Sequence, residues 1–104
     1  MEQVIEMVSF ALNEGVQEQD FVKAAKHSQT FISSLPGFLY RSLSFNATEN
    51  TWTDIVYWQS MSHAKSAGEQ FMESKECQPL IALINPESVL MQHQDIKMGC
   101  ECQG

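Results

Sequence analysis

Apolar and polar residues follow each other along this chain in periods that predict alternating strands and helices. Residues 3–12 alternate so that both sides carry apolar side chains, which predicts a central strand buried on both faces. One face holds Val4, Val8, Phe10 and Leu12, and the other holds Ile5, Met7 and Ala11. Residues 17–35 repeat apolar positions three and four apart, which predicts a helix that ends at Pro36 and Gly37.

The second half of the chain predicts a hairpin, two helices and a last strand. Residues 37–47 and 52–59 have strand character and are separated by the turn sequence 48–51, so they are expected to pair. A helix is expected from about 61 to 75, capped by the hydroxyl of Ser60 or Ser62. The remaining predictions are a short apolar helix at 78–85, with Pro79 in its first turn, and a strand at 88–98.

The predicted order β-α-β-β-α-β is the ferredoxin-like arrangement, in which two helices cover one face of a four-stranded antiparallel sheet. The first and third strands are apolar on both sides, so the opposite face of the sheet also needs a cover. The simplest cover is the sheet of a second copy. The sequence therefore predicts an α+β fold that dimerises into an α/β barrel.

Length and charge narrow the classes of partner. A chain of 104 residues is the size of one domain, expected at 1–98 with a flexible tail at 99–104. The net charge of -7 argues against nucleic acid and against an anionic membrane surface. No apolar run approaches the ~20 residues that span a bilayer. Glu2 and Glu6 make the N-terminus a poor signal peptide, so a cytoplasmic protein is expected.

The cysteines and histidines do not form a recognisable metal or disulfide pattern. The chain has an odd number of cysteines, Cys77, Cys100 and Cys102, which favours free thiols over a disulfide framework. The C-x-C of the tail supplies only two of the roughly four ligands of a closed zinc site. H-x-x-x-H, C-x-x-C and H-x-E motifs are absent from the sequence. No metal is predicted.

Large and small side chains meet in the stretch DIVYWQSMSHAKSA, residues 54–67. Alternation places Trp52, Asp54, Val56 and Trp58 on one face of the third strand and puts Tyr57 on the other. The following helix presents an inward stripe of mostly small residues: Ala64, Ala67, Gly68 and Phe71. Ordinary core packing or a ligand cavity would both explain this pairing.

Two further side chains are candidates for chemistry. His63 lies in the first turn of the helix at 61–75, where the helix dipole favours the neutral imidazole. It is either a general base or a solvent-exposed or capping residue. Arg41 is the only arginine, and either binds an anionic group of a substrate or pairs with an acidic residue on a neighbouring strand.

The stretches LPGFLYRSLSF (35–45) and DIVYWQSMSHAKSAGEQF (54–71) resemble the dimeric α/β-barrel superfamily, in particular its antibiotic-biosynthesis-monooxygenase-like branch. The likeness extends over residues 3–98. It implies a homodimer with a pocket between the helices and the sheet of each subunit. Haem-degrading members resemble this outline but carry an Asn on the first strand and a Trp–His pair around the second helix. Residues 3–12 contain no Asn, and the helix at 61–75 contains no Trp.

Two functions are therefore expected. The first is a cofactor-independent monooxygenase that acts on a small aromatic, phenolic or quinol substrate without metal or flavin. His63 would be its base, Asp54 or Arg41 would orient the substrate, and the walls would be Trp52, Trp58, Tyr57, Ala67 and Phe71. The alternative is a non-catalytic homodimer of the same fold that binds or senses a small hydrophobic or aromatic molecule in the same pocket.

Overall fold

The computed structural model describes residues 2–99. Its elements in chain order are β1 (Val4–Phe10), α1 (Glu18–Ser33), β2 (Phe38–Asn46), β3 (Thr51–Trp58), α2 (Met61–Glu73), α3 (Gln78–Leu83), a 3-10 turn (Pro86–Ser88) and β4 (Leu90–Asp95). Each predicted strand and helix is present. The predictions for Cys100 and Cys102 concern positions outside the described residues.

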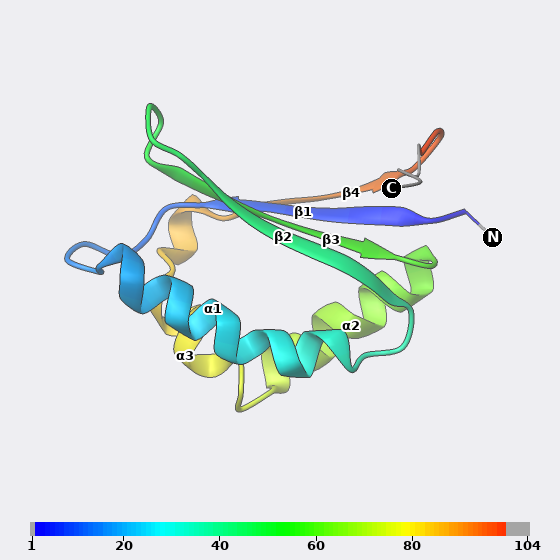
Figure 1. Ribbon diagram of the computed structural model, residues 1–104, viewed down its shortest axis with the longest axis horizontal. Coiled ribbons are helices and arrows are strands. Elements are labelled where there is room, and N and C mark those ends of the chain that lie inside the picture. The colour runs from blue at the N-terminus through cyan, green and yellow to red at the C-terminus, as the bar shows by residue number, and fades with distance from the viewer. Residues whose placement is uncertain (1, 100–104) are drawn as a thin grey trace, which may run out of the picture.

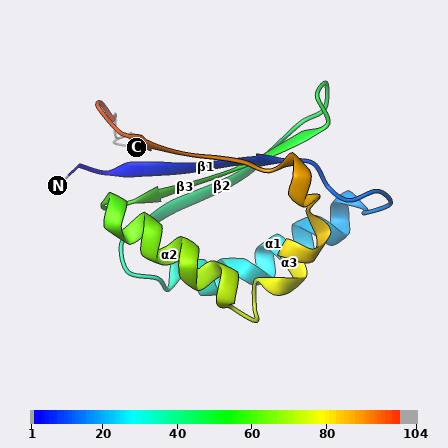
Figure 2. The ribbon, with the colours of Figure 1, turned by 180° about the vertical axis from the view of Figure 1, so that it is seen from behind.

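The four strands form one antiparallel sheet in the order β2-β3-β1-β4. The helices all lie on one side of it, and the opposite face of the sheet is bare in this single chain (Figures 1 and 2). The predicted ferredoxin-like α+β fold is therefore confirmed. No helix among the described residues is long and apolar enough to cross a membrane.

The register of the sheet decides which side chains face the helices. Val4 pairs with Trp58 and Phe10 with Trp52, and all four are buried against the helices. The core has two parts along this face. One lies around Trp58 with Ala64 and Ala67 of α2, and the other lies around Trp52 with residues of α1 and α3. Between these two parts of the core, the space that separates the sheet from α2 is either filled by side chains or left as a cavity.

A bulge in β2 corrects the simple alternation of that strand. The register shifts between Phe38 and Tyr40, so that Phe38 and Arg41 both face the helices while Tyr40 faces away. An uninterrupted strand starting from Phe38 would have turned Arg41 outward, since successive side chains alternate between faces. The bulge therefore brings the only arginine of the chain to the interior.

The last strand is shorter than its predicted range of 88–98. Pro86 begins a 3-10 turn, Asn85 accepts a hydrogen bond from the backbone N–H of Glu87, and Ser88 Oγ accepts one from the N–H of Ala11. The ladder with β1 begins only after these contacts, at Leu90. The turn therefore ties the end of α3 to the segment that follows β1.

Candidate functional site

A cavity of about 290 Å³ lies between the sheet and the helices. Most of its lining is apolar and comes from β1, β3, β4, the helices α1, α2 and α3, and the segment between α3 and β4. The lining includes Glu6, Asp54, Trp58, Ala67, Gly68, Phe71 and Met91. Ligand pockets commonly start at about 300 Å³, so this cavity suits one small molecule.

The cavity exists because α2 presents small side chains to the sheet. Ala64 and Ala67 are buried, and Ser60 caps the helix by accepting a hydrogen bond from the N–H of His63, as predicted. At Gly68 an added Cβ would meet only the Oε2 atom of Glu6, at 3.8 Å. The absence of a side chain at Gly68 therefore leaves room above the carboxylate of Glu6.

Glu6 is a carboxylate in an apolar setting. It lies on β1 between Val4 and Val8, on the face that looks toward the helices, and its side chain is 14% exposed. Burial raises the pKa of Glu6 above its usual 4.5, and the nearby charge of Asp54 adds to the rise. His93 and the indole of Trp58 act in the opposite direction, without cancelling the effect.

The nearest donors approach Glu6 without completing a hydrogen bond. The Nε2 atom of His93, on β4, lies 3.5 Å from Glu6 Oε2. That nitrogen and the indole N–H of Trp58 are both buried, and neither has a hydrogen-bond partner among the described residues. Buried polar atoms without partners are rare in folded proteins, so these two nitrogens beside Glu6 lack the contacts that they would normally make.

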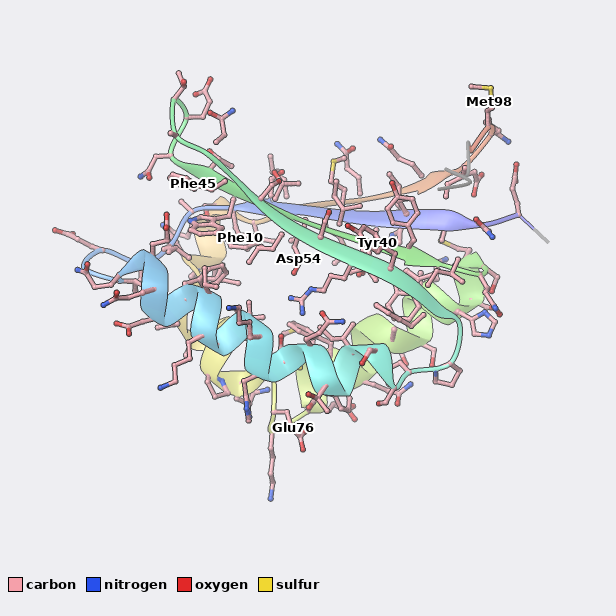
Figure 3. The ribbon with its side chains drawn as sticks, in the orientation of Figure 1. Phe10, Tyr40, Phe45, Asp54, Glu76 and Met98 are labelled. Atoms are coloured by element: carbon pink, nitrogen blue, oxygen red, sulfur yellow. The ribbon has the colours of Figure 1, made fainter. Side chains whose placement is uncertain are left out.

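Asp54 differs from Glu6 because its carboxylate forms an ion pair with Arg41. The guanidinium donates to both carboxylate oxygens, with distances of 3.0 Å and 2.7 Å. Its third nitrogen donates to the hydroxyl of Ser28 at 3.1 Å and to the side-chain oxygen of Gln29 at 3.2 Å, both on α1. Figure 3 shows Asp54 on the side of the sheet that faces the helices. The prediction that Arg41 pairs with an acidic residue on a neighbouring strand is therefore confirmed.

His63 is not among the residues that line the cavity. Its Nδ1 atom lies 2.7 Å from the hydroxyl of Ser60, and its ring covers Gly37, where an added Cβ would overlap it. Gly37 has a positive φ of 84°. The contacts of His63 are therefore those of a residue that joins the start of α2 to the loop before β2.

The predicted aromatic walls are divided among three places. Trp58 and Phe71 line the cavity, together with Ala67. Trp52 faces the helices but is packed between Phe21 and Phe45, with ring centroids 4.9 Å and 4.8 Å away.

Tyr57 lies on the opposite face of the sheet and contacts Tyr40. The structure thus brings Asp54, Trp58, Ala67 and Phe71 together and leaves Trp52, Tyr57 and His63 outside.

The thiol of Cys77 lies outside this site. Cys77 is a buried free cysteine at the start of α3, and burial raises the pKa of its thiol. Among residues 2–99 no group of three or more His, Cys, Asp and Glu side chains is arranged to hold a metal ion.

Sequence reasoning missed Glu6 and the pairing of Glu6 with His93. The signal for Glu6 was present, since alternation places it on the same face as Val4 and Val8. A charged residue in the middle of a two-faced apolar strand is unusual, because burying it is costly. His93 could not be predicted as the neighbour of Glu6 from the sequence, because their position opposite each other depends on the β1–β4 register.

Comparison with known proteins gives a consistent fold and little sequence similarity. No family model matches the chain, and no curated protein matches it by sequence. Among solved structures, SnoaB from Streptomyces nogalater, described as a cofactor-independent oxygenase, is 16% identical with a TM-score of 0.70, and the match covers 100% of both chains. A provisionally named antibiotic biosynthesis monooxygenase from Bordetella bronchiseptica is also 16% identical, with a TM-score of 0.77 over 94% of this chain and 100% of that one.

A third structure, from Chloroflexus aurantiacus, carries the same provisional name. It is 15% identical with a TM-score of 0.68 over 95% of this chain and 97% of that one. At these identities the likeness concerns the fold. The chain therefore has the fold of antibiotic-biosynthesis-monooxygenase-like proteins, and the resemblance seen in the sequence is confirmed at that level.

Proposed function

We propose that this protein is a cofactor-independent monooxygenase that acts on a small phenolic or quinol substrate bound in the cavity between the sheet and α2. The observation that carries the proposal is a carboxylate, Glu6, at the wall of a small apolar cavity, with its pKa raised by burial. The likeness to SnoaB, an oxygenase described as cofactor-independent, supports the same class of reaction.

Glu6 replaces His63 as the base in this proposal. A raised pKa makes the carboxylate a stronger base while it remains ionised above that pKa. Its neighbour Asp54 is paired with Arg41, and both of its carboxylate oxygens already accept hydrogen bonds from the guanidinium. Two adjacent carboxylates in such different surroundings are a recurring arrangement in acid–base sites.

The reaction balances with dioxygen as the second substrate. Glu6 takes one proton from an acidic methylene group beside the phenol, and the carbanion forms a carbon–oxygen bond with dioxygen. Glu6 returns that proton to the peroxide oxygen, which gives a hydroperoxide. Glu6 then takes the second methylene proton, a carbonyl forms as the O–O bond breaks, and hydroxide leaves with the proton as water.

The net change converts one methylene group and one dioxygen into one carbonyl group and one water, so the substrate carbon supplies all four electrons. The cavity contributes an apolar space in which the deprotonated substrate meets dioxygen away from bulk water.

Oxygen uptake with a panel of phenols and quinols, including phenols with an acidic methylene group, tests the proposal. The protein should accelerate dioxygen consumption for at least one of them, and Glu6→Gln should reduce the rate by about 100-fold or more, as expected for a lost general base. His63→Gln is the matched comparison and should retain the rate. Loss of activity in His63→Gln with full activity in Glu6→Gln would contradict the assignment of the base.

A second candidate is a non-catalytic protein that binds a small aromatic molecule in the same cavity. The position of His63 favours it, because the residue first considered as the base does not line the cavity. Binding of the panel without oxygen uptake would select this candidate.

We also propose that the protein acts as a homodimer. On the face of the sheet without helices, Ile5, Met7, Ile55 and Tyr57 are half-buried and Tyr40 is 59% exposed. A second copy packed on this face would bury these apolar and aromatic side chains.

A further inference from the structure

We infer that the cavity recognises an uncharged hydroxyl group on its ligand, and that this group donates its hydrogen bond to Glu6. The inference deepens the proposed function and rests on it, since both concern the same cavity. It adds an order of preference among aromatic molecules of one size: a neutral hydroxyl is preferred over an aryl ether, and an aromatic carboxylate binds most weakly of the three.

Glu6 lacks a donor with complete hydrogen-bond geometry. An ionised carboxylate only accepts hydrogen bonds, and among residues 2–99 no side chain donates one to Glu6 in full. The groups that face it are His93 from β4, the indole of Trp58 and Asp54 from β3, with Gly68 above it on α2. Because Gly68 has no side chain, a hydrogen-bond donor of a ligand can approach Glu6 from the side of α2.

The charges at this wall disfavour an anionic ligand. The only guanidinium of the chain is bonded to Asp54 and to α1, so it is not free to bind an anion. Besides this ion pair, the ionisable groups at this wall are Glu6 and His93. A ligand carboxylate would therefore lose its hydration in an apolar space beside the carboxylate of Glu6, with no free guanidinium to pair with it, which is strongly unfavourable.

The polar groups beside Glu6 distinguish a hydroxyl from an ammonium group. The indole N–H of Trp58, in a side chain only 2% exposed, and the Nε2 atom of His93 both lack acceptors among the residues that the structure describes. A hydroxyl can donate to Glu6 and, after a small adjustment of these side chains, accept from one of them. An ammonium can only donate, and it loses its hydration on entering an apolar cavity.

Isothermal titration calorimetry with four probes that share one ring system tests the inference on the full chain. The probes are 2-naphthol, 2-methoxynaphthalene, 2-naphthoate and 2-naphthylmethylamine. We expect 2-naphthol to bind most tightly, and the methyl ether about tenfold more weakly because it leaves Glu6 without a donor. The carboxylate should bind still more weakly. Equal affinity of the ether or of the carboxylate with the phenol would overturn the inference, and tightest binding of the amine would replace it with a cation site.

Two variants show that Glu6 is the cause. Glu6→Gln should remove the preference of the phenol over the ether and improve the binding of 2-naphthoate. Glu49→Gln, at the exposed β2–β3 turn, changes the net charge by the same amount far from the cavity. It should leave all four affinities unchanged. A similar effect of both variants would mean that overall charge, and not the cavity, sets the order.

Hydroxyl selectivity and catalysis can fail separately. Hydroxyl selectivity without oxygen uptake would retain this inference and reject the proposed oxygenation. Oxygen uptake without selectivity would do the reverse. Failure of all four probes to bind would reject this inference, whereas the proposed oxygenation is decided by oxygen uptake with the phenol and quinol panel.

Discussion

Glu6 and His93 face each other across the β1–β4 ladder, with Oε2 and Nε2 3.5 Å apart at the edge of an apolar cavity. The contact is too long to offset the burial of the carboxylate, and the pKa of Glu6 is raised. The next carboxylate on the same face, Asp54, is held by Arg41 at 2.7 Å. Asp54 is thus paired with a permanently charged guanidinium and Glu6 is not. Of the two carboxylates, only Glu6 is therefore free to accept a proton or a hydrogen bond from a ligand.

Replacing Glu6 should change how stability depends on pH. A carboxyl group whose pKa is raised by folding binds its proton more tightly in the folded state, so its contribution to stability falls as pH rises from 4.5 through the raised value. Glu6→Gln removes this penalty. The variant should therefore be at least as stable as the wild type at pH 7, and the difference should shrink as pH falls toward 4.5.

Urea unfolding of both proteins between pH 4 and pH 8 measures this difference. Glu49→Gln is the control and should show no such pH-dependent gain. A wild type that becomes relatively more stable than Glu6→Gln as pH rises would show that the Glu6 carboxylate is stabilised, and not strained, by its surroundings.

The Arg41–Asp54 pair should matter for folding. Its side chains are 5% and 16% exposed, and removing one member leaves the other charge buried. Arg41→Met should lower the free energy of unfolding by about 3 kcal/mol, while the double variant Arg41→Met, Asp54→Leu should lose much less. Denaturant melts check both. Lys97→Met, which breaks the exposed pair with Glu2, should have no measurable effect. Equal losses in the single and double variants would contradict the explanation by an unpaired charge.

Substitution of Gly68 should change the space in the cavity while the protein stays folded. An added methyl group meets only Glu6 at an ordinary contact distance, so Gly68→Ala should raise helix stability by about 0.5–1 kcal/mol. Gly68→Leu should fill the cavity and abolish binding of 2-naphthol while the protein stays folded. Calorimetry and thermal melts together test this. Strong destabilisation by Gly68→Leu would mean that the space is too tight to be a ligand site.

His63 should act on folding and not on the cavity. Gly37 has a positive φ and lies against the His63 ring, so Gly37→Ala is expected to be strongly destabilising. The double variant Gly37→Ala, His63→Ala should regain only the stability that was lost to the overlap with the ring. The loss caused by backbone strain at position 37 should remain. Thermal melts measure the recovery. His63→Ala alone should leave the affinity for 2-naphthol unchanged, and a loss of affinity would return His63 to the site.

The bare face of the sheet should mediate dimerisation. Light scattering at micromolar concentration should give about twice the 11.8 kDa chain mass. Ile55→Asp places a charge in the middle of that face, opposite Met7, and should shift the protein to monomers. Thr48→Asp in the exposed β2–β3 turn is the control for added charge. A stable wild-type monomer would contradict the barrel.

The sequence by itself determined the order of the elements and most of the sheet face that meets the helices. Strict alternation placed Trp52, Asp54 and Trp58 on one side, because successive side chains of a strand point to opposite faces. The hydroxyl of Ser60 and the small residues of α2 were equally readable, since capping and close packing depend on local chemistry.

Only the tertiary structure decided the site. The β2 bulge turned Arg41 inward onto Asp54, and the register of β4 brought His93 to Glu6. The direction of His63 toward Gly37, away from the cavity, also depends on how the loop before β2 packs on α2. These contacts join residues far apart along the chain, and their geometry depends on register and packing that local periodicity does not specify.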